Sequence, residues 1–323
     1  MNRKIFVSDI HFDQDLRARL CQGAQDCGFE IEFAKGQGDL PADPADVEII
    51  FGNTAGPVRA AENLKWVCLT SAGLDGFLQT GAMDGREDQV ILSNSSGAYG
   101  VSIAEHMVMV TLMMLRRMPE FTAEMEGHVW APKRAQKSIK DARVTVLGAG
   151  EIGTAYAERV RAFGPARITA VNRSGVQKNP VYDQVFRISD LHQVLPETDI
   201  LAMSLPGTPE TNGVIGREEL ELMPEGAYLV NVGRGNAIDE AALCKALESG
   251  RLAGAALDVM VTEPLPADDP LWDAKNILLT PHVSGKMTLP YTCRRIAEMF
   301  LEDLVRYTDG RPLLHQVDPR RGY

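Results

Sequence analysis

The chain has 323 residues, of which 45% are hydrophobic and 24% are charged, close to an average globular protein. At about 150 residues per domain, this length predicts about two domains, each large enough to form its own core. The formal net charge of -11 argues against a broad surface for nucleic acid or for an anionic membrane.

We expect neither a secretory signal peptide nor a membrane span. Its first residues, MNRKIFVSDIHF, lack the long apolar stretch of a secretory signal peptide. The most apolar segment, residues 98–118, is interrupted by Glu105 and His106, so it predicts a buried helix. The cysteines form no CxxC pair, which predicts reduced, mostly buried thiols in a cytoplasmic protein, with neither a disulfide framework nor a metal site. They are Cys21, Cys27, Cys68, Cys244 and Cys293.

Short apolar runs rich in Val, Ile and Leu alternate with helical patterns along nearly the whole chain. Runs that are apolar on both faces are typical of parallel strands covered by helices, so we expect an α/β fold with crossover connections. In the helical pattern at 239–250, Asp239 stands near the start, and Gly250 is placed to end the helix. The strand candidates are residues 4–10, 47–54, 65–73, 90–96, 143–150, 167–174, 199–206, 227–235, 254–260 and 276–285.

A glycine-rich loop begins at Gly148, almost midway along the chain, so an α/β block precedes it. The helical pattern at residues 289–310 could return to that first block. We therefore expect two Rossmann-like or flavodoxin-like domains with parallel sheets. The dinucleotide-binding domain (98–286) would be inserted into a discontinuous substrate-binding domain (1–97 and 287–323).

The glycine-rich loop reads GAGEIG and stands between a strand pattern and a helix pattern. Its first glycine permits a tight turn, its second lets the backbone approach a pyrophosphate, and its third lets the helix pack against the strand. The phosphates would meet N–H groups at the positive end of the helix dipole. A glycine-rich turn without a ligand is the alternative. The expected cofactor-binding residues are Gly148, Gly150, Glu151, Ile152 and Gly153.

The next strand candidate ends in Asn172, Arg173 and Ser174, where an NAD-binding chain should carry an acidic residue. Such an acid would bind the ribose 2′-hydroxyl and repel a 2′-phosphate. Arginine instead offers a charged, bidentate grip on a phosphate. The sequence therefore predicts that NADP(H) is preferred and NAD(H) is possible, and an ordinary solvated arginine is the alternative.

Three chemically active residues follow later strand candidates: Arg234, Glu263 and His282. A 2-oxo acid needs its carboxylate held, its carbonyl polarised, and a proton delivered as hydride reaches the carbon. Arg234 can do the first two through its fixed fork of donors, and His282 can donate or accept the proton. Glu263 could orient the imidazole and favour its protonated form. Taken singly such residues prove little, but together, downstream of a dinucleotide loop, they predict hydride transfer.

Five motifs carry a resemblance that runs over nearly the whole chain: VLGAGEIG, SLPGTPETNGVIG, LVNVGRGNAIDEAAL, GRLAGAALDVMVTEPLPADDPLW and NILLTPHVSG. The chain resembles the D-isomer-specific 2-hydroxyacid dehydrogenases, which include glyoxylate/hydroxypyruvate reductases, D-lactate dehydrogenases and phosphoglycerate dehydrogenases. The motifs are specific for the family and not for one substrate.

By that resemblance, Arg234 anchors the substrate, Glu263 is the partner of the histidine, and His282 is the acid/base. Asp258 would meet the nicotinamide carboxamide, and the resemblance also places His282 beside the cofactor. The backbone N–H groups of Ser71, Ala72 and Gly73 would bind the substrate carboxylate. The segment 121–143, including Trp130, resembles the arm that pairs two subunits, so a homodimer is expected. The stretches lining the cofactor would include Pro206, Thr211 and Val232.

The predicted function is NADP(H)-preferring interconversion of a small 2-oxo acid and its D-2-hydroxy acid, with no metal. The D stereochemistry comes from the resemblance alone. One alternative is a dinucleotide-sensing, corepressor-like interaction protein, and another is a phosphoglycerate dehydrogenase within the same family.

Overall fold

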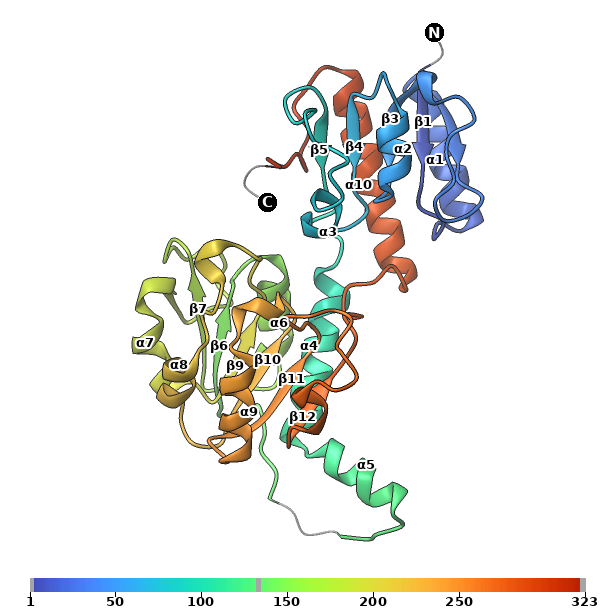
Figure 1. Cartoon of the computed structure of the whole chain (residues 1–323). Coiled ribbons are helices and arrows are strands. Elements are labelled where there is room, and N and C mark those ends of the chain that lie inside the picture. Colours follow the sequence, from blue (N-terminus) through green and yellow to red (C-terminus); the bar gives the residue numbers. More distant parts are fainter. Residues whose placement is uncertain (1–2, 132–134, 320–323) are drawn as a thin grey trace. The chain divides into compact units, whose positions relative to one another are not determined.

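The computed structural model describes residues 3–131 and 135–319 and divides into two compact units (Figure 1). Unit 1 comprises residues 1–99 and 287–323, and unit 2 comprises residues 100–286. The chain thus leaves unit 1 after Tyr99, completes unit 2, and returns to unit 1 at Met287.

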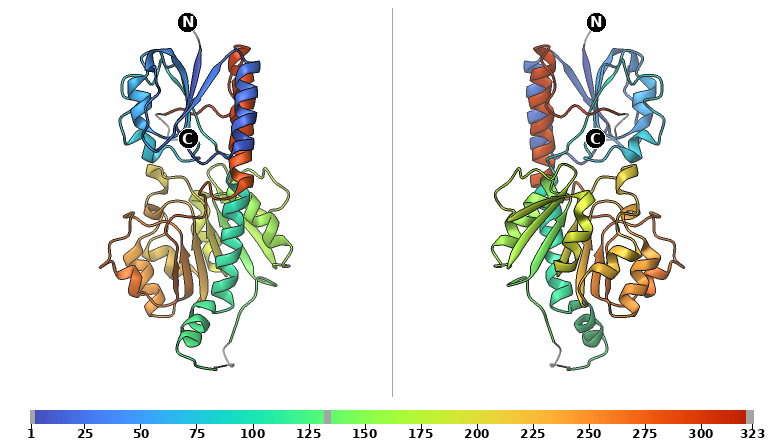
Figure 2. Two further views of the ribbon diagram at one scale, coloured as in Figure 1. Left: turned by 90° about the vertical axis from the view of Figure 1, so that its right-hand side faces the viewer. Right: turned by 90° about the vertical axis from the view of Figure 1, so that its left-hand side faces the viewer.

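Unit 1 contains a five-stranded parallel sheet with the order β2-β1-β3-β4-β5, the flavodoxin-like order. Helices α1 and α10 lie side by side on one face of this sheet (Figure 2). Phe300 of α10 stacks on Phe51 of β3, with the ring centroids 4.1 Å apart, so the last helix closes the core of the first sheet. The elements are β1 (Lys4–Val7), α1 (Gln14–Asp26), β2 (Glu30–Phe33), β3 (Val47–Phe51), α2 (Ala55–Ala60), β4 (Trp66–Cys68), α3 (Asp75–Leu78), β5 (Ile91–Ser93) and α10 (Pro290–Thr308).

Unit 2 contains a seven-stranded parallel sheet with the order β12-β11-β10-β9-β6-β7-β8. Numbered from β6, its first six strands follow the Rossmann order, which reverses between β6 and β9. The predicted fold class, two α/β domains of Rossmann-like and flavodoxin-like type, is confirmed. The elements are α4 (Gly100–Leu115), α5 (Met118–Glu126), β6 (Arg143–Leu147), α6 (Glu151–Arg161), β7 (Arg167–Asn172), β8 (Gln184–Arg187), α7 (Leu191–Val194), β9 (Ile200–Met203), α8 (Arg217–Leu222), β10 (Ala227–Asn231), α9 (Glu240–Glu248), β11 (Leu252–Leu257) and β12 (Ile277–Leu279).

Short 3₁₀ helices complete the described structure. They span Pro44–Asp46, Ile188–Asp190, Leu195–Glu197, Pro209–Thr211, Gly235–Ala237 and Pro270–Asp273.

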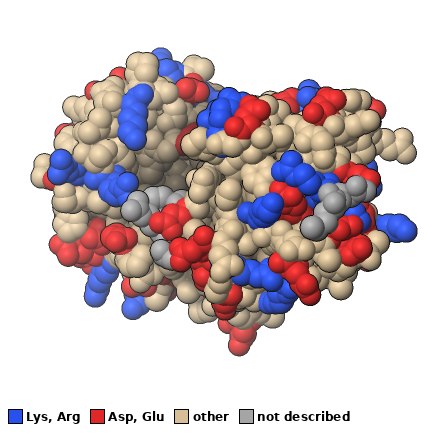
Figure 3. Space-filling model, turned by 90° about the horizontal axis from the view of Figure 1, so that it is seen from above, with Lys and Arg blue, Asp and Glu red and all other residues tan. Residues whose placement is uncertain are grey.

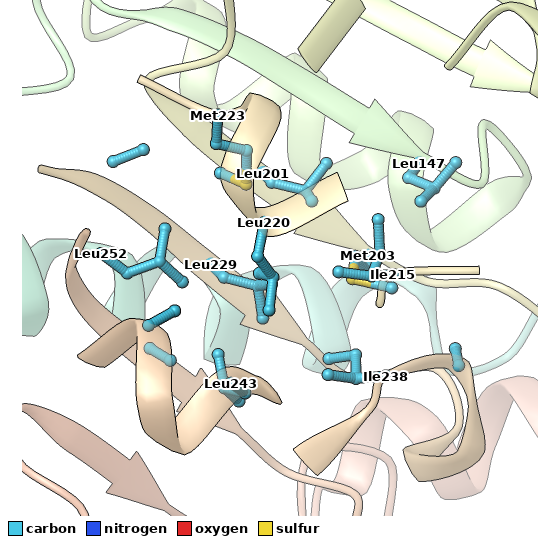
Figure 4. Close-up of a cluster of buried hydrophobic side chains, with 14 of the residues drawn as sticks. Leu147, Leu201, Met203, Ile215, Leu220, Met223, Leu229, Ile238, Leu243 and Leu252 are labelled. Carbon is cyan, nitrogen blue, oxygen red and sulfur yellow. The ribbon is translucent and has the colours of Figure 1, made fainter. Parts of the chain in front are cut away.

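The sheet of unit 2 is buried on both faces, as its continuous apolar strands require. On one face, Leu201 and Leu229 pack with Leu220 of α8 and Leu243 of α9 (Figure 4). On the other face, α4 packs against α6, β10 and β11. This two-sided packing holds the carboxyl ends of the strands in fixed positions along one edge.

All ten predicted strands are present, and two further strands were missed. The missed strands, β2 and β8, are edge strands of four residues, and each mixes polar with apolar residues. An edge strand has one partner and greater exposure, so it needs no continuous apolar run. The predicted helix at 239–250 is confirmed as α9, with Asp239 as its N-cap and Gly250 just beyond its end.

The expectation of mostly buried thiols is wrong. Only Cys68 and Cys293 are buried, whereas Cys27 and Cys244 are half-buried and Cys21 is exposed. Cys21 lies on the outer side of α1, where the helical spacing of buried Leu16, Leu20 and Ala24 turns it to solvent.

The described residues include no helix long and apolar enough to cross a membrane, and no group of three or more potential metal ligands. On the face shown in Figure 3, Lys and Arg side chains lie among Asp and Glu side chains, without a broad basic area.

Candidate active site

All seven strands of unit 2 end at the same edge of the sheet, and the predicted cofactor and catalytic residues follow six of them. The order reverses between β6 and β9, so the loops after these two strands diverge. In open α/β sheets, ligands bind at the carboxyl ends of the strands beside such a reversal.

The glycine-rich loop between β6 and α6 fits a pyrophosphate. Gly148 has a φ of 100°, and a Cβ atom there would lie 2.9 Å from the carbonyl carbon and oxygen of Ser204. A Cβ atom on Gly153 would overlap the carbonyl oxygen of Gly148, so this glycine lets α6 pack against the loop. A Cβ atom on Gly150 would face open space, and no side chain caps the first turn of α6, where Glu151 and Ile152 stand. The loop therefore combines tight packing on one side with an accessible helix N-terminus on the other.

The turn after β7 is held together by Asn172. Its side-chain oxygen accepts hydrogen bonds from the backbone N–H groups of Ser174 (3.0 Å) and Gly175 (2.7 Å). Its amide nitrogen donates to the carbonyl oxygen of Val176 at 3.1 Å. An asparagine here thus builds the turn that presents its neighbours, in addition to removing the acidic charge.

Two arginines flank this turn. Arg173 is exposed. The pKa of Glu210, in the loop that follows β9, is lowered mainly by hydrogen bonds from its own N–H group and from the Thr208 hydroxyl, and the charge of Arg173 lowers it further. Arg187 ends β8, directly opposite Asn172 in the strand pairing. A Cβ atom on Gly175 would lie 2.6 Å from the Arg187 Cγ, so the glycine makes room for that side chain beside the turn. Sequence reasoning missed Arg187 because it missed β8.

The loop after β9 is closed by its own side chains. The Thr211 hydroxyl donates to the carbonyl oxygen of Pro206 at 2.7 Å and accepts from the N–H of Thr208 at 3.0 Å. Thr211 is buried and Pro206 is exposed. The neighbouring loop begins at Val232, which is buried and donates its N–H to Met203. These three residues therefore shape the backbone that surrounds the glycine-rich loop.

Arg234 follows β10 in a loop clamped by Asn231. The buried Asn231 side chain donates to the carbonyl oxygen of Arg234 at 2.9 Å and accepts from the N–H of Gly233 at 3.0 Å. A Cβ atom on Gly207 would lie 3.2 Å from the Arg234 Cγ, so the arginine stem lies against the loop after β9. The guanidinium is half-buried and donates to the Gly233 carbonyl at 2.8 Å.

The structure brings His282 and Glu263 together. The imidazole Nδ1 lies 2.7 Å from Glu263 Oε2, and the other carboxylate oxygen accepts from the N–H of Met260 at 3.0 Å. Because Glu263 engages Nδ1, the Nε2 atom is the one that can exchange a proton with a ligand. His282 has 43% of its side chain exposed, so a ligand can reach it.

Asp258 fixes the loop that carries His282. The residue is 2% exposed, and its carboxylate accepts from the N–H groups of Val283 (2.9 Å) and Ser284 (3.0 Å) and from the Thr280 hydroxyl (2.6 Å). Its backbone carbonyl accepts from the N–H of His282 at 2.9 Å. These contacts, which sequence reasoning did not predict, assign to Asp258 a structural role in addition to the expected cofactor contact.

The remaining predicted residues belong to unit 1 and follow β4. The Ser71 hydroxyl donates to the carbonyl oxygen of Gly73 at 2.7 Å, and Asn94 donates to that of Ala72 at 2.6 Å. Both carbonyls are thereby engaged, which orients the two peptide planes. Within the described residues, the N–H groups of Ala72 and Gly73 have no protein acceptor.

Comparison with known proteins identifies the family. The family model described as "D-isomer specific 2-hydroxyacid dehydrogenase, NAD binding domain" matches residues 108–284. The chain belongs to this family. It is therefore an oxidoreductase of the 2-hydroxyacid dehydrogenase type, and the predicted resemblance is confirmed.

Individual relatives agree with this assignment. Glyoxylate/hydroxypyruvate reductase A of Salmonella newport is 32% identical over 286 residues, which cover 87% of this chain and 88% of that protein. A D-isomer specific 2-hydroxyacid dehydrogenase from Xanthobacter autotrophicus Py2, solved with NADPH and MES, is 30% identical with a TM-score of 0.82, covering 100% of this chain and 99% of that one. A family member from Aeromonas salmonicida is 31% identical with a TM-score of 0.83, covering 98% and 99%.

The glycine-rich loop supports a prediction that separates folding from binding. Gly150→Ala adds a methyl group in open space at a negative φ, so the dehydrogenase should fold normally but lose at least about 10-fold in dinucleotide affinity. Gly153→Ala forces α6 away from the loop and should cost about 1–3 kcal/mol of stability as well. Thermal unfolding and titration with dinucleotide measure the two effects. Tight binding by Gly150→Ala would show that no pyrophosphate approaches this glycine.

Proposed function

We propose that this family member reduces a small 2-oxo acid to its D-2-hydroxy acid and prefers NADP(H). One observation carries the proposal: the His282–Glu263 pair lies at the carboxyl edge of the unit 2 sheet, where the glycine-rich loop and Arg234 also lie. The reductase relative and the NADPH complex of another relative support it.

In the proposed reaction, Arg234 binds the substrate carboxylate and polarises the 2-oxo group. A reduced nicotinamide, when held by unit 2, would be the source of the hydride for carbon 2. His282 donates a proton from Nε2 to the carbonyl oxygen, which gives the alcohol, and Glu263 stabilises the charged imidazole before the transfer. The reverse reaction uses the same groups, with His282 accepting the hydroxyl proton.

The cofactor would lie along unit 2. The N–H groups at Glu151 and Ile152 would meet the pyrophosphate, and Asp258, Pro206 and Val232 would line the nicotinamide side. Arg173 and Ser174, presented by the Asn172 turn, would bind the 2′-phosphate, and we add Arg187 to this site.

In unit 1, the loop of Ser71, Ala72 and Gly73 would bind the substrate carboxylate through its N–H groups. We accordingly assign substrate binding to unit 1 and dinucleotide binding to unit 2.

His282→Ala tests the catalytic assignment. Loss of the proton donor should lower the rate of NADPH oxidation with glyoxylate, hydroxypyruvate or pyruvate by about 10²–10⁴-fold, while the Kd for NADPH changes less than about threefold. Absorbance of the reduced nicotinamide and a binding titration measure the two quantities.

His192→Ala is the matched control, because His192 Nε2 also contacts a glutamate, Glu219, at 2.6 Å. This variant should keep the wild-type rate. Equal loss of turnover and NADPH binding in His282→Ala would argue that His282 is structural.

Arg173→Ala and Arg187→Ala test the cofactor preference. Each removes a charge-assisted contact to the 2′-phosphate, so the Kd for NADPH should rise about 10–100-fold, whereas that for NADH should change less than about threefold. Arg167→Ala, at the opposite end of β7, should leave the preference unchanged. A wild-type enzyme that prefers NADH would overturn the NADP(H) assignment, and an unchanged preference in one variant would remove that arginine from the site.

We also propose that two copies of the chain pair through the arm that includes α5. This segment exposes Met125 (69%), Val129 (57%) and Trp130 (93%), an unusual density of apolar surface for a single copy. Trp130→Ser should weaken dimerisation at least about 10-fold, because buried tryptophans dominate many interfaces. Analytical ultracentrifugation over a concentration series measures this, with Trp272→Ser, another exposed tryptophan, as control. A monomeric wild type at every concentration would refute the proposal.

A further inference from the structure

His106 lies at the buried side of the loop that carries His282. Its side chain projects from α4, is 12% exposed, and approaches Thr280 and Asp258 where β11 and β12 end. Val230, Val232 and Leu278 line the same small space, so the imidazole is surrounded mainly by apolar groups.

The hydrogen bonds that join His106, Thr280 and Asp258 both point from the imidazole towards the carboxylate. The Thr280 hydroxyl lies 2.6 Å from Asp258 Oδ1, and an ionised carboxylate can only accept, so the hydroxyl donates to it. The Thr280 oxygen is then left to accept from His106 Nε2, which lies 3.2 Å away. Burial lowers the pKa of His106, and the charge of Asp258 opposes this less strongly. His106 is therefore a neutral imidazole with its proton on Nε2.

The direct route from His106 to Asp258 is weak. His106 Nε2 and Asp258 Oδ1 are 4.0 Å apart, beyond hydrogen-bonding distance. The Thr280 hydroxyl lies between them and contacts both, so His106 acts on the carboxylate through Thr280.

The Asp258 carboxylate in turn stabilises an unfavourable backbone conformation at His282. His282 has a φ of 51°, in the left-handed region, which costs about 1–3 kcal/mol in residues other than glycine. The N–H groups of Val283 and Ser284, which follow it, both donate to Asp258. A carboxylate that is free to rotate would restrain this turn less, and the His282 ring would lose its alignment with Glu263.

We propose that His106 is a positioning residue for the reaction: through Thr280 it orients Asp258, which fixes the loop and thereby the His282 ring. The inference rests on the proposed role of His282. It assigns no contact between His106 and substrate or cofactor.

The test uses His106→Leu, His106→Gln, Thr280→Val and the double variant His106→Leu/Thr280→Val in the full-length protein. His106→Leu should lower kcat about 10-fold and leave the Kd for NADPH within about threefold. His106→Gln keeps an N–H donor near the Nε2 position and should recover most of the rate. If His106 acts through Thr280, the double variant should lose no more than Thr280→Val alone.

Two readouts distinguish positioning from simple loss of packing. Hydrogen exchange at Val283 and Ser284 should accelerate in His106→Leu, measured without any dinucleotide. The KM for the oxo acid should stay within about threefold while kcat falls, because the variant misaligns the His282 ring and leaves Arg234 in place.

Thr111→Val is the matched control, because Thr111 is a buried polar residue of the same helix whose hydroxyl contacts Met107 and Tyr156. It should lower stability without changing loop exchange or kcat. Additive losses in the double variant, or unchanged exchange and kcat in His106→Leu, would overturn the inference. A wild type without oxo-acid turnover, or an active His282→Ala, would instead refute the proposed function.

Discussion

Four loops at the carboxyl edge of the unit 2 sheet pack backbone against backbone, at positions where a side chain would not fit. Gly148 lies against Ser204, and a Cβ atom on Gly233 would lie 2.6 Å from the backbone of Leu205. A Cβ atom on Gly235 would overlap the backbone of Met260. The loops after β6, β9, β10 and β11 therefore fix one another. The precise placement of reacting groups depends on such rigidity, since displacement by about 1 Å can cost about 100-fold in rate.

Asp258 extends this rigidity to the last loop of the edge. A buried carboxylate is costly unless it is well hydrogen-bonded, and Asp258 accepts two N–H groups and one hydroxyl. The free energy of these bonds opposes the left-handed strain at His282. The buried Asp258 carboxylate thereby stabilises a loop conformation that an uncharged side chain would hold less firmly. Through Thr280 it also connects His106 of α4 to the loop that carries His282.

The sequence offers candidates for this site where the chemistry depends on residue type. Glycine spacing indicated the dinucleotide loop, and the residues after apolar strands indicated Arg234, Glu263 and His282. The sequence predicts little where the role of a residue depends on how distant segments of the chain pair or pack. Arg187 becomes a neighbour of the Asn172 turn only through the β7–β8 register, and β8 has no continuous apolar pattern. His106 reads as one of several polar residues in an apolar helix until α4 is packed against the sheet, where His106 lies beside the ends of β11 and β12.

Two hydrogen-bonded histidine–glutamate pairs among the described residues of unit 2 show why local geometry alone does not define a reactive group. In each pair the glutamate contacts the imidazole at 2.6 or 2.7 Å and accepts a backbone N–H with its other oxygen, from Gly216 in one and from Met260 in the other. His192, however, lies on α7, between β8 and β9, where its side chain is 51% exposed. His282 instead sits on a strained backbone that Asp258 holds, beside the loops that carry Arg234 and the glycine turn. The same pair of side chains therefore gives an ordinary surface contact on a helix and an acid/base candidate at the edge of the sheet.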